Sequence, residues 1–223
     1  MRLLITGTGS GVGKTWVGCA LARALRSSGK KVIALKPVET SCAGMPEEDE
    51  DGVLLAQAAG QSQPLHAIFR LPEPVAPALA SDRSGITIDF DALVLKIERY
   101  GGEAEYLLIE GVGGLLSPVT WEWNMVDVAR ALGASALVVA VDRMGAINHT
   151  LLILSALELA GVPCAGAVLT KPNTPDQSTG SNAAAIARLS GLHRVVSLPR
   201  NTSDHDAALK TLEEWLSRVP ATA

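Results

Sequence analysis

The sequence has few aromatic residues, few cysteines and almost no excess of either charge. Aromatic residues make up 4% of the chain, and the three cysteines, Cys19, Cys42 and Cys164, lack the spacing of a metal site. An odd number of scattered cysteines is typical of reduced thiols, so we expect a cytoplasmic protein. The net charge of −4 and the lack of a basic stripe argue against nucleic acid as a partner.

Long hydrophobic runs are also missing. The longest, such as residues 136–141, are far too short to span a bilayer, so we expect no membrane partner. The apolar N-terminus does not read as a signal peptide, because it leads directly into a glycine-rich motif. With 48% hydrophobic residues the chain can bury one sizeable core, and we expect residues 1–223 to form a single domain.

Short apolar segments alternate with helical patterns along the chain. The predicted strands are residues 3–6, 31–35, 106–109, 136–141, 165–169 and 195–198. The predicted helices are residues 15–28, 89–100, 126–133, 147–161, 183–191 and 206–218. This alternation predicts a doubly wound α/β fold with a mainly parallel sheet, in which ligands bind at the carboxyl ends of the strands. Residues 71–84 contain three prolines, so we expect a long irregular segment there, as a substrate loop.

A glycine-rich motif, GTGSGVGKT at residues 7–15, directly follows the first predicted strand. Such a turn points backbone N–H groups inward at the positive end of a helix, where they can hold a phosphate. Lys14 would reach the β- and γ-phosphates, and the Thr15 hydroxyl would ligate Mg²⁺. Five residues separate Gly7 from Gly13, one more than in the usual pattern. The motif predicts binding of a nucleoside triphosphate.

Polar residues follow the other predicted strands. Lys36 follows the second strand and would project into the same crevice as the glycine-rich motif. Glu110 precedes a second glycine-rich turn and is a candidate for a direct or outer role at Mg²⁺. An acidic cluster at residues 47–51 precedes a helix, and one member could reach the metal. Asn148 begins a later helix, either as its cap or to bind a carboxylate. Each also fits a purely structural role.

Four motifs together, GTGSGVGKT, KPVET, EGVGG and GAINHT, resemble the dethiobiotin synthetase family in order and spacing. The resemblance covers essentially the whole chain and implies a Mg²⁺- and ATP-dependent ring closure. In that reaction CO₂ and 7,8-diaminopelargonate form a carbamate, ATP phosphorylates it, and the second amine closes a cyclic urea. The implied products are dethiobiotin, ADP and phosphate. The resemblance also implies a homodimer with the substrate site at the interface.

The same resemblance implies roles for individual residues. Lys14 and Lys36 would be catalytic, because they bring positive charge to the transferring phosphoryl group. The metal ligands would be Thr15, Asp51 and Glu110. Asp51 is preferred to Asp49 because it directly precedes an apolar helix. The substrate would contact Ser10, Thr40, Gly113 and, across the dimer interface, Asn148. The nucleotide would contact Gly11, Val12, Gly13, Lys14, Thr15, Trp16, Asp51, Glu110, Gly111, Val112, Gly113, Thr170, Lys171, Pro199, Arg200 and Asn201.

Two positions depart from the family pattern. In some family members an acidic residue follows the hydroxyl residue of the loop, where this chain has Gly11, so the role of that carboxylate is absent or supplied elsewhere. Base recognition in the family often uses an Asn at the end of the fifth strand, where this chain has Thr170, so we expect weak discrimination among bases. Two other functions fit the architecture. One is a small-molecule kinase, in which KPVET and INHT would have no obvious role. The other is a switch ATPase of the chromosome-partitioning or septum-positioning type. Those proteins resemble one another in an early loop lysine, where this chain has Gly9, and in a basic or amphipathic surface that residues 206–218 do not match. The motifs favour the synthetase.

Overall fold

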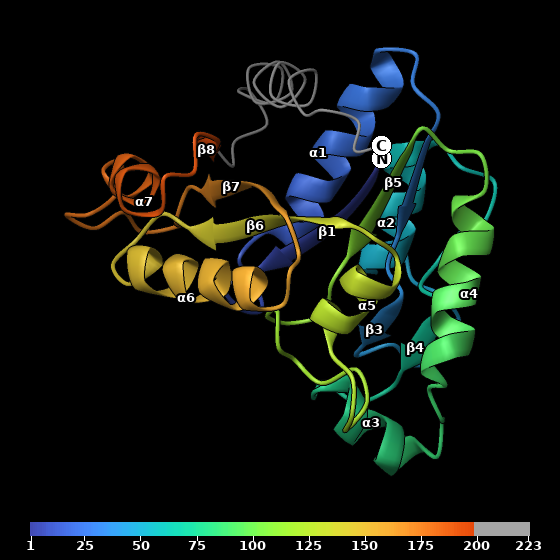
Figure 1. Cartoon of the computed structure of the whole chain (residues 1–223). Coiled ribbons are helices and arrows are strands. Elements are labelled where there is room, and N and C mark those ends of the chain that lie inside the picture. The colour runs from blue at the N-terminus through green and yellow to red at the C-terminus, as the bar shows by residue number, and fades with distance from the viewer. Residues whose placement is uncertain (199–223) are drawn as a thin grey trace.

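The core of the protein is a six-stranded parallel sheet with the strand order β2-β5-β1-β6-β7-β8. The computed structural model describes residues 1–198 (Figure 1). The strands are β1 (Arg2–Gly7), β2 (Val32–Leu35), β5 (Tyr106–Glu110), β6 (Ser135–Val141), β7 (Cys164–Thr170) and β8 (Val195–Leu198). All six predicted strands are therefore confirmed within about one residue at each end, as is the doubly wound class.

Helices cover both faces of this sheet (Figure 1). In β1, Leu3 and Ile5 pack in the same core as α1 (Lys14–Ser27) and α2 (Asp51–Ala59), while Leu4 packs in the opposite core. Successive residues of a strand point to opposite faces, so a strand buried on both sides is apolar throughout. The opposite core includes α4 (Phe90–Gly101), α5 (Met125–Ala131) and α6 (Ala146–Leu159), and α7 (Asn182–Ser190) packs beside α6.

A second, smaller sheet was not expected from the sequence. It consists of β3 (Val38–Thr40) and β4 (Phe69–Leu71), which pair in parallel and are too short to produce a periodic signal. The expectation of an irregular segment at residues 71–84 is wrong in its second half, which forms α3 (Pro77–Ser84). Pro77 occupies the first turn of α3, where no backbone N–H is needed, so this proline starts a helix instead of preventing one.

The carboxyl ends of the central strands meet at one edge of the sheet. Ile5 of β1 pairs with Glu110 of β5, and Leu35 of β2 pairs with Ile109. The glycine-rich motif, Glu110 and Lys36 therefore emerge side by side. No helix within residues 1–198 is both long and apolar enough to cross a membrane. The predicted helix at 206–218 lies outside the described residues, and the single domain stays a prediction.

Gly52, in the first turn of α2, generates a stability prediction. A Cβ added there would lie 2.4 Å from the Ala67 backbone nitrogen and 2.9 Å from the His66 carbonyl carbon. Alanine would gain about 1 kcal/mol of helix propensity over glycine. Backbone displacement outweighs that gain, so we expect Gly52→Ala to lower the free energy of unfolding by about 2 kcal/mol, measured by urea denaturation.

Gly9→Ala is the matched control, because a Cβ at Gly9 meets nothing within 4 Å. Its unfolding midpoint should equal that of the unsubstituted protein. Equal midpoints for the Gly52 and Gly9 variants would contradict the close packing of α2 on residues 66–67.

Candidate active site

The glycine-rich motif forms a loop between β1 and α1. Gly11 and Gly13 adopt φ values of 70° and 98°, in the left-handed region that glycine tolerates best. The loop is held to the sheet because the Thr8 N–H donates to the Val139 carbonyl at 2.9 Å. Gly13 is the N-cap of α1, so the positive end of that helix lies at the loop. This is the geometry that holds a phosphate group.

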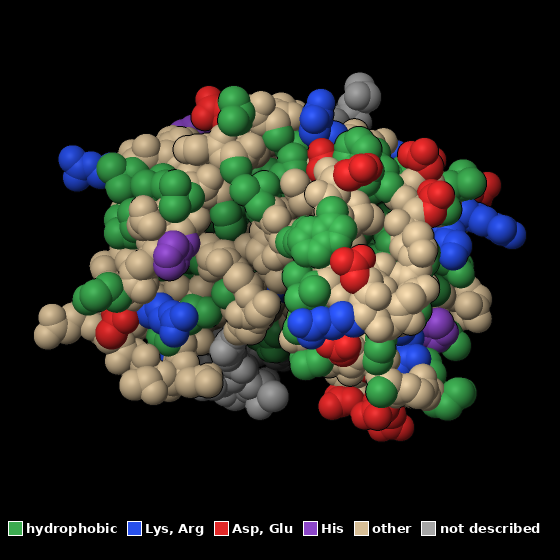
Figure 2. Space-filling model, turned by 90° about the horizontal axis from the view of Figure 1, so that it is seen from below, with side chains coloured by type: hydrophobic (Ala, Val, Ile, Leu, Met, Phe, Trp, Pro, Cys, Tyr) green, Lys and Arg blue, Asp and Glu red, His purple; other side chains and the backbone are tan. Residues whose placement is uncertain are grey.

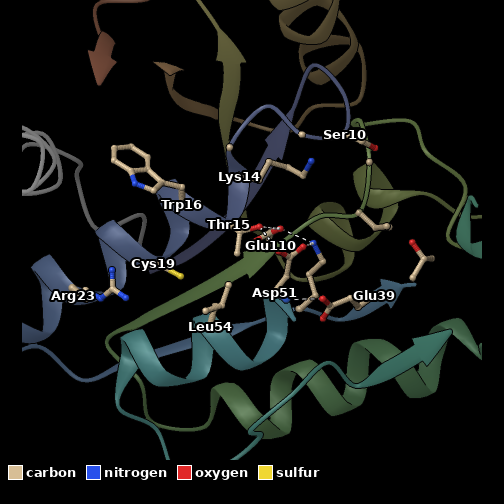
Figure 3. Close-up of a pocket in the computed structure, with 16 residues that line it drawn as sticks. Ser10, Lys14, Thr15, Trp16, Cys19, Arg23, Glu39, Asp51, Leu54 and Glu110 are labelled. Carbon is tan, nitrogen blue, oxygen red and sulfur yellow. Dashed lines mark hydrogen bonds and ion pairs between the residues drawn. The ribbon is translucent and has the colours of Figure 1, made fainter. Parts of the chain in front are cut away.

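The loop borders a cavity of about 590 Å³ that also reaches α2 and the end of β5 (Figure 3). Most of the residues predicted to bind nucleotide, metal or substrate line this one cavity. They are Ser10, Gly11, Gly13, Lys14, Thr15, Trp16, Lys36, Thr40, Asp51, Glu110, Val112 and Gly113. The GTGSGVGKT, KPVET and EGVGG motifs and Asp51 of the acidic cluster are therefore brought to a single site, whereas Asn148 of GAINHT lines another cavity.

Lys36, Thr15, Asp51 and Glu110 form a charged cluster inside this cavity. Figure 3 shows Thr15, Asp51 and Glu110 lying next to one another. The Lys36 ammonium group donates to Asp51 Oδ2 at 2.7 Å and to Glu110 Oε1 at 2.5 Å. The Thr15 hydroxyl is 2.6 Å from Asp51 Oδ1 and 3.0 Å from Glu110 Oε1. The two carboxylates thus share both a lysine and a threonine, whereas Asp49 is exposed.

Burial and neighbouring charges shift the pKa values of this cluster. Burial lowers the pKa of Lys36, but the carboxylates of Glu110 and Asp51 raise it by more, so the net pKa lies above the usual lysine value. Burial raises the pKa of Glu110, and the Lys36 charge offsets only part of that rise. Burial also acts to raise the pKa of Asp51, but Lys36 and the Thr15 hydrogen bond lower it overall. Lys36 therefore carries its positive charge at neutral pH.

The cluster fits a divalent metal ion. Glu110 Oε2 is buried and has no hydrogen-bond partner among the residues that the structure describes. A buried carboxylate oxygen without a partner is costly, and a cation is the partner that removes this cost. Two carboxylates and a hydroxyl supply the hard oxygen ligands that Mg²⁺ prefers. That Thr15, Asp51 and Glu110 bind a metal stays a prediction.

Lys14 is the first residue of α1, directly after the glycine-rich loop. Its ammonium group donates to the Gly9 carbonyl at 2.9 Å. Burial, and then the positive charge of Lys36, lowers the pKa of Lys14 to about 8. The positive charges of Lys14 and Lys36 repel each other, and a bound anion would offset that repulsion. A nucleoside triphosphate carries about four negative charges. The electrostatics of the cavity therefore suit a nucleotide phosphate chain.

Some predicted site residues lie outside this cavity. Thr170 is fully buried, and its hydroxyl donates to the Val12 carbonyl at 2.8 Å, so it ties the glycine-rich loop to the end of β7. Gly111 is buried and its N–H donates to the Ile5 carbonyl at 2.9 Å. Their contacts with a nucleotide stay predictions.

Two more predicted residues line other cavities. Lys171 borders a cavity of about 280 Å³ at the ends of β7 and β8. Asn148 is exposed in the first turn of α6 and borders a third cavity, with Asn182 of α7. Pro199, Arg200 and Asn201 lie outside the described residues.

Four residues that line the active-site cavity were given no role by the sequence interpretation. They are Cys19, Arg23, Glu39 and Leu54. Cys19 and Arg23 follow Trp16 by three and seven residues, which is the spacing of one helix face, so their position was detectable from the sequence. Glu39 is buried within the KPVET motif, but its burial depends on β3, a strand too short to be detected from the sequence.

The contact of Lys36 with both carboxylates leads to a prediction about stability. Lys36→Met would leave the buried Glu110 carboxylate without its cation, so we expect a loss of about 3 kcal/mol in the free energy of unfolding, measured by urea denaturation. Lys36→Met combined with Glu110→Gln removes both charges, so it should recover most of that loss.

Lys30→Met is the control, because Lys30 forms an exposed ion pair with Glu105 at 3.0 Å. We expect no measurable change from it. A Lys36→Met protein as stable as the Lys30→Met protein would show that the buried pair is not coupled as described.

Solved structures similar to this chain share its fold. A ParA family ATPase from Chlorobium tepidum has a TM-score of 0.57 and 15% identity, and the match covers 99% of this chain and 93% of that protein. The septum site-determining protein MinD from Pyrococcus horikoshii, solved with Mg-ADP, has a TM-score of 0.53 and 16% identity, with coverage of 98% and 90%. Identities this low show the fold alone.

Sequence relatives are more specific. A family model described as an AAA domain matches residues 1–206. The ATP-dependent dethiobiotin synthetase BioD of Anaeromyxobacter dehalogenans is 39% identical over 201 residues, which are 88% of this chain and 89% of the relative. The protein of the same name from Mycobacterium tuberculosis is 38% identical over 208 residues, which are 92% and 89% of the two chains. Identity at this level over nearly the full length of both proteins places the chain in the ATP-dependent dethiobiotin synthetase family.

Proposed function

We propose that this protein uses ATP and Mg²⁺ to close 7,8-diaminopelargonate and CO₂ into dethiobiotin, releasing ADP and phosphate. The observation that carries the proposal is one cavity in which the phosphate-binding loop, the Lys36 cluster and Thr40 all meet. Phosphoryl transfer to a carbamate brings two anions together, so a catalyst must supply converging positive charge. Lys14, bonded to the glycine-rich loop, and Lys36, bonded to the two carboxylates, supply it.

The chemistry needs few groups from the protein beyond position and charge. One amine of the substrate adds to CO₂ and loses a proton, giving a carbamate. A carbamate oxygen then attacks the γ-phosphorus of ATP, and ADP leaves. The second amine attacks the carbonyl carbon of the carbamic-phosphoric anhydride, and phosphate leaves as the ring closes. Lys14 and Lys36 neutralise the charge on the transferring group, and Thr40 and Ser10 hold the diamine or its carbamate.

We also propose that Thr15, Asp51 and Glu110 hold Mg²⁺. The unpartnered Glu110 Oε2 and the two carboxylates support this assignment. When bound, Mg²⁺ neutralises phosphate charge and orients the β- and γ-phosphates. Lys36 would then exchange part of its present contact with the carboxylates for the carbamate or γ-phosphate.

A homodimer would complete the site. α6 buries only Ala146, Thr150 and Leu157, while Leu152 and Leu159 are 61% and 92% exposed. Asn148, Leu152 and Leu159 share one face of this helix, because they are spaced by four and seven residues. Figure 2 shows hydrophobic side chains gathered on the side of the molecule where α6 lies. A second copy packed on this face would bury it and carry Asn148 toward the substrate carboxylate of the partner.

We further propose a cytoplasmic location. The thiols of Cys19, Cys42 and Cys164 are free, and free thiols persist in a reducing compartment. Burial raises the pKa of Cys19 and of Cys42 to about 12, so these thiols are poor nucleophiles at neutral pH.

The proposed function is tested by supplying diaminopelargonate, bicarbonate, Mg²⁺ and ATP and detecting dethiobiotin by mass. We expect one ADP per dethiobiotin and negligible ADP when the diamine is omitted. A slow ATPase that ignores the diamine and is stimulated by DNA or lipid would instead indicate a switch ATPase.

The metal assignment predicts a graded dependence on Mg²⁺. Asp51→Asn should raise the Mg²⁺ concentration for half-maximal activity by about tenfold, because an amide ligates Mg²⁺ more weakly than a carboxylate does. Asp49 is an exposed residue just before α2, so Asp49→Asn is the matched control and should leave that concentration unchanged. If Asp49→Asn produced the shift and Asp51→Asn did not, the metal ligand would be Asp49.

Base selectivity should be weak at Thr170. Its hydroxyl donates to the Val12 carbonyl, so it offers no donor to an adenine edge. Affinity then comes mainly from the triphosphate and Mg²⁺, and we expect CTP, GTP or UTP to support dethiobiotin formation within about tenfold of ATP, or ~1.4 kcal/mol. The measurement is kcat/KM for the four triphosphates. A preference for ATP over all three by more than roughly a hundredfold, ~2.7 kcal/mol, contradicts this expectation.

A further inference from the structure

The first turn of α2 has no cap of its own. The N-cap residue, Glu50, makes no side-chain hydrogen bond to the N–H groups of α2. Glu39 of β3 supplies the missing acceptors instead, since its Oε1 accepts from the Asp51 N–H at 2.6 Å and its Oε2 accepts from the Gly52 N–H at 2.9 Å. A carboxylate at the positive end of a helix also interacts favourably with the helix dipole. One side chain thus fixes the backbone of Asp51 and of the residue after it.

The partner strand holds the residue on the other side of Asp51. Arg70 of β4 lies directly opposite Glu39 in the parallel pair. Its guanidinium group forms a two-point contact with the Glu50 carboxylate, with Nε at 2.8 Å from Oε2 and Nη2 bonded to Oε1. The same group donates to the Gly44 carbonyl at 2.7 Å and to the Met45 carbonyl at 3.2 Å. Arg70 therefore ties the loop before α2 to the small sheet.

Glu39, Glu50 and Cys42 also lie close enough together to resemble a metal site. Their contacts indicate another role. Glu50 is neutralised by Arg70, and both oxygens of Glu39 are engaged by backbone N–H groups. Burial raises the pKa of the Cys42 thiol to about 12, so it is not a thiolate ligand at neutral pH. The carboxylates of Glu39 and Glu50 are thus satisfied by backbone N–H groups and by Arg70, without a metal ion.

Asp51 lies at the point where these contacts converge on the active-site cavity. Its side chain is 35% exposed and is held by the Thr15 hydroxyl and the Lys36 ammonium group. The position of the carboxylate is therefore set by these two partners and by the backbone from which the Asp51 side chain extends. Helix α2 cannot shift toward residues 66–67 to compensate, because Gly52 already touches that backbone.

We propose that Glu39 and Arg70 are positioning residues that fix the Asp51 carboxylate for Mg²⁺ binding. The inference rests on the proposed function. Glu39 holds residues 51 and 52, and Arg70 holds residue 50, so the two paired positions of the small sheet clamp the chain on both sides of Asp51. Groups that orient a metal ligand typically change metal affinity or activity by about 10- to 100-fold when they are removed.

The test compares Glu39→Gln with Glu73→Gln. Gln has one acceptor oxygen, and its NH₂ group would face a second N–H donor, so one of the two bonds to α2 is lost. Glu73 forms an exposed pair with Arg83 at 2.7 Å, just beyond β4, and serves as the control. We expect Glu39→Gln to raise the Mg²⁺ concentration for half-maximal activity about tenfold, with most of the turnover restored at saturating Mg²⁺. Glu73→Gln should leave it unchanged.

A second measurement needs no turnover. Calorimetric titration of the protein with ADP, with and without Mg²⁺, gives the gain in ADP affinity that Mg²⁺ produces. Glu39→Gln should reduce this gain at least fivefold while leaving the affinity for metal-free ADP within twofold. If the unsubstituted protein made no dethiobiotin, the proposed function would fail, yet this titration would still test the positioning role.

Arg70→Lys provides an independent variant, with Arg83→Lys as its control. Lysine keeps the charge but loses the two-point contact with Glu50. We expect a shift in the Mg²⁺ requirement in the same direction as for Glu39→Gln. A folded Glu39→Gln protein with an unchanged requirement for Mg²⁺ overturns the proposal, and Arg70→Lys decides in the same way if the Glu39 variant does not fold.

Discussion

The buried ammonium group of Lys36 holds two carboxylates together, and the rest of the site depends on this contact. Lys36 and Glu110 follow directly after Leu35 and Ile109, which pair in the parallel sheet, so the fold itself sets the two charges side by side. Separating either charge from its partner inside the protein is costly. Lys36 therefore stays bonded to the carboxylates until a cation replaces it there or an anion binds it. The site is therefore arranged to exchange one set of ionic contacts for another.

The sheet order explains why a phosphate-binding loop meets this cluster. β1 lies next to β5, so the loop after β1 emerges beside Glu110, and Thr15 on the first turn of α1 reaches both carboxylates. Asp51 comes from a different part of the chain and arrives on α2, which is held by the small sheet of β3 and β4. The large sheet thus supplies the nucleotide-binding groups, and the small sheet supports the residue that completes their charge balance.

The sequence was sufficient to predict the large sheet and most of the residues that line the candidate cavity, because both leave local signals. Apolar runs without alternation identified the six strands, and the order of glycines, lysine and threonine identified the loop. The choice of Asp51 over Asp49 agrees with the contact that Asp51 makes with Thr15. The roles of Glu39 and Arg70 were not predictable, because they depend on the pairing of two three-residue strands that lie far apart in the chain. Pro77 misled the interpretation, because the same residue can start a helix or interrupt one.

We propose that Thr15, Asp51 and Glu110 receive the metal of a bound nucleotide while Lys36 turns toward the transferring phosphate. A crystal structure with Mg²⁺, a non-hydrolysable ATP analogue and diaminopelargonate tests it most directly. We expect a metal ion held by oxygen atoms of Thr15, Asp51 and Glu110, directly or through water, with Lys36 in contact with the γ-phosphate or the substrate. A metal ion bound elsewhere, with Lys36 still bridging Asp51 and Glu110, would contradict it.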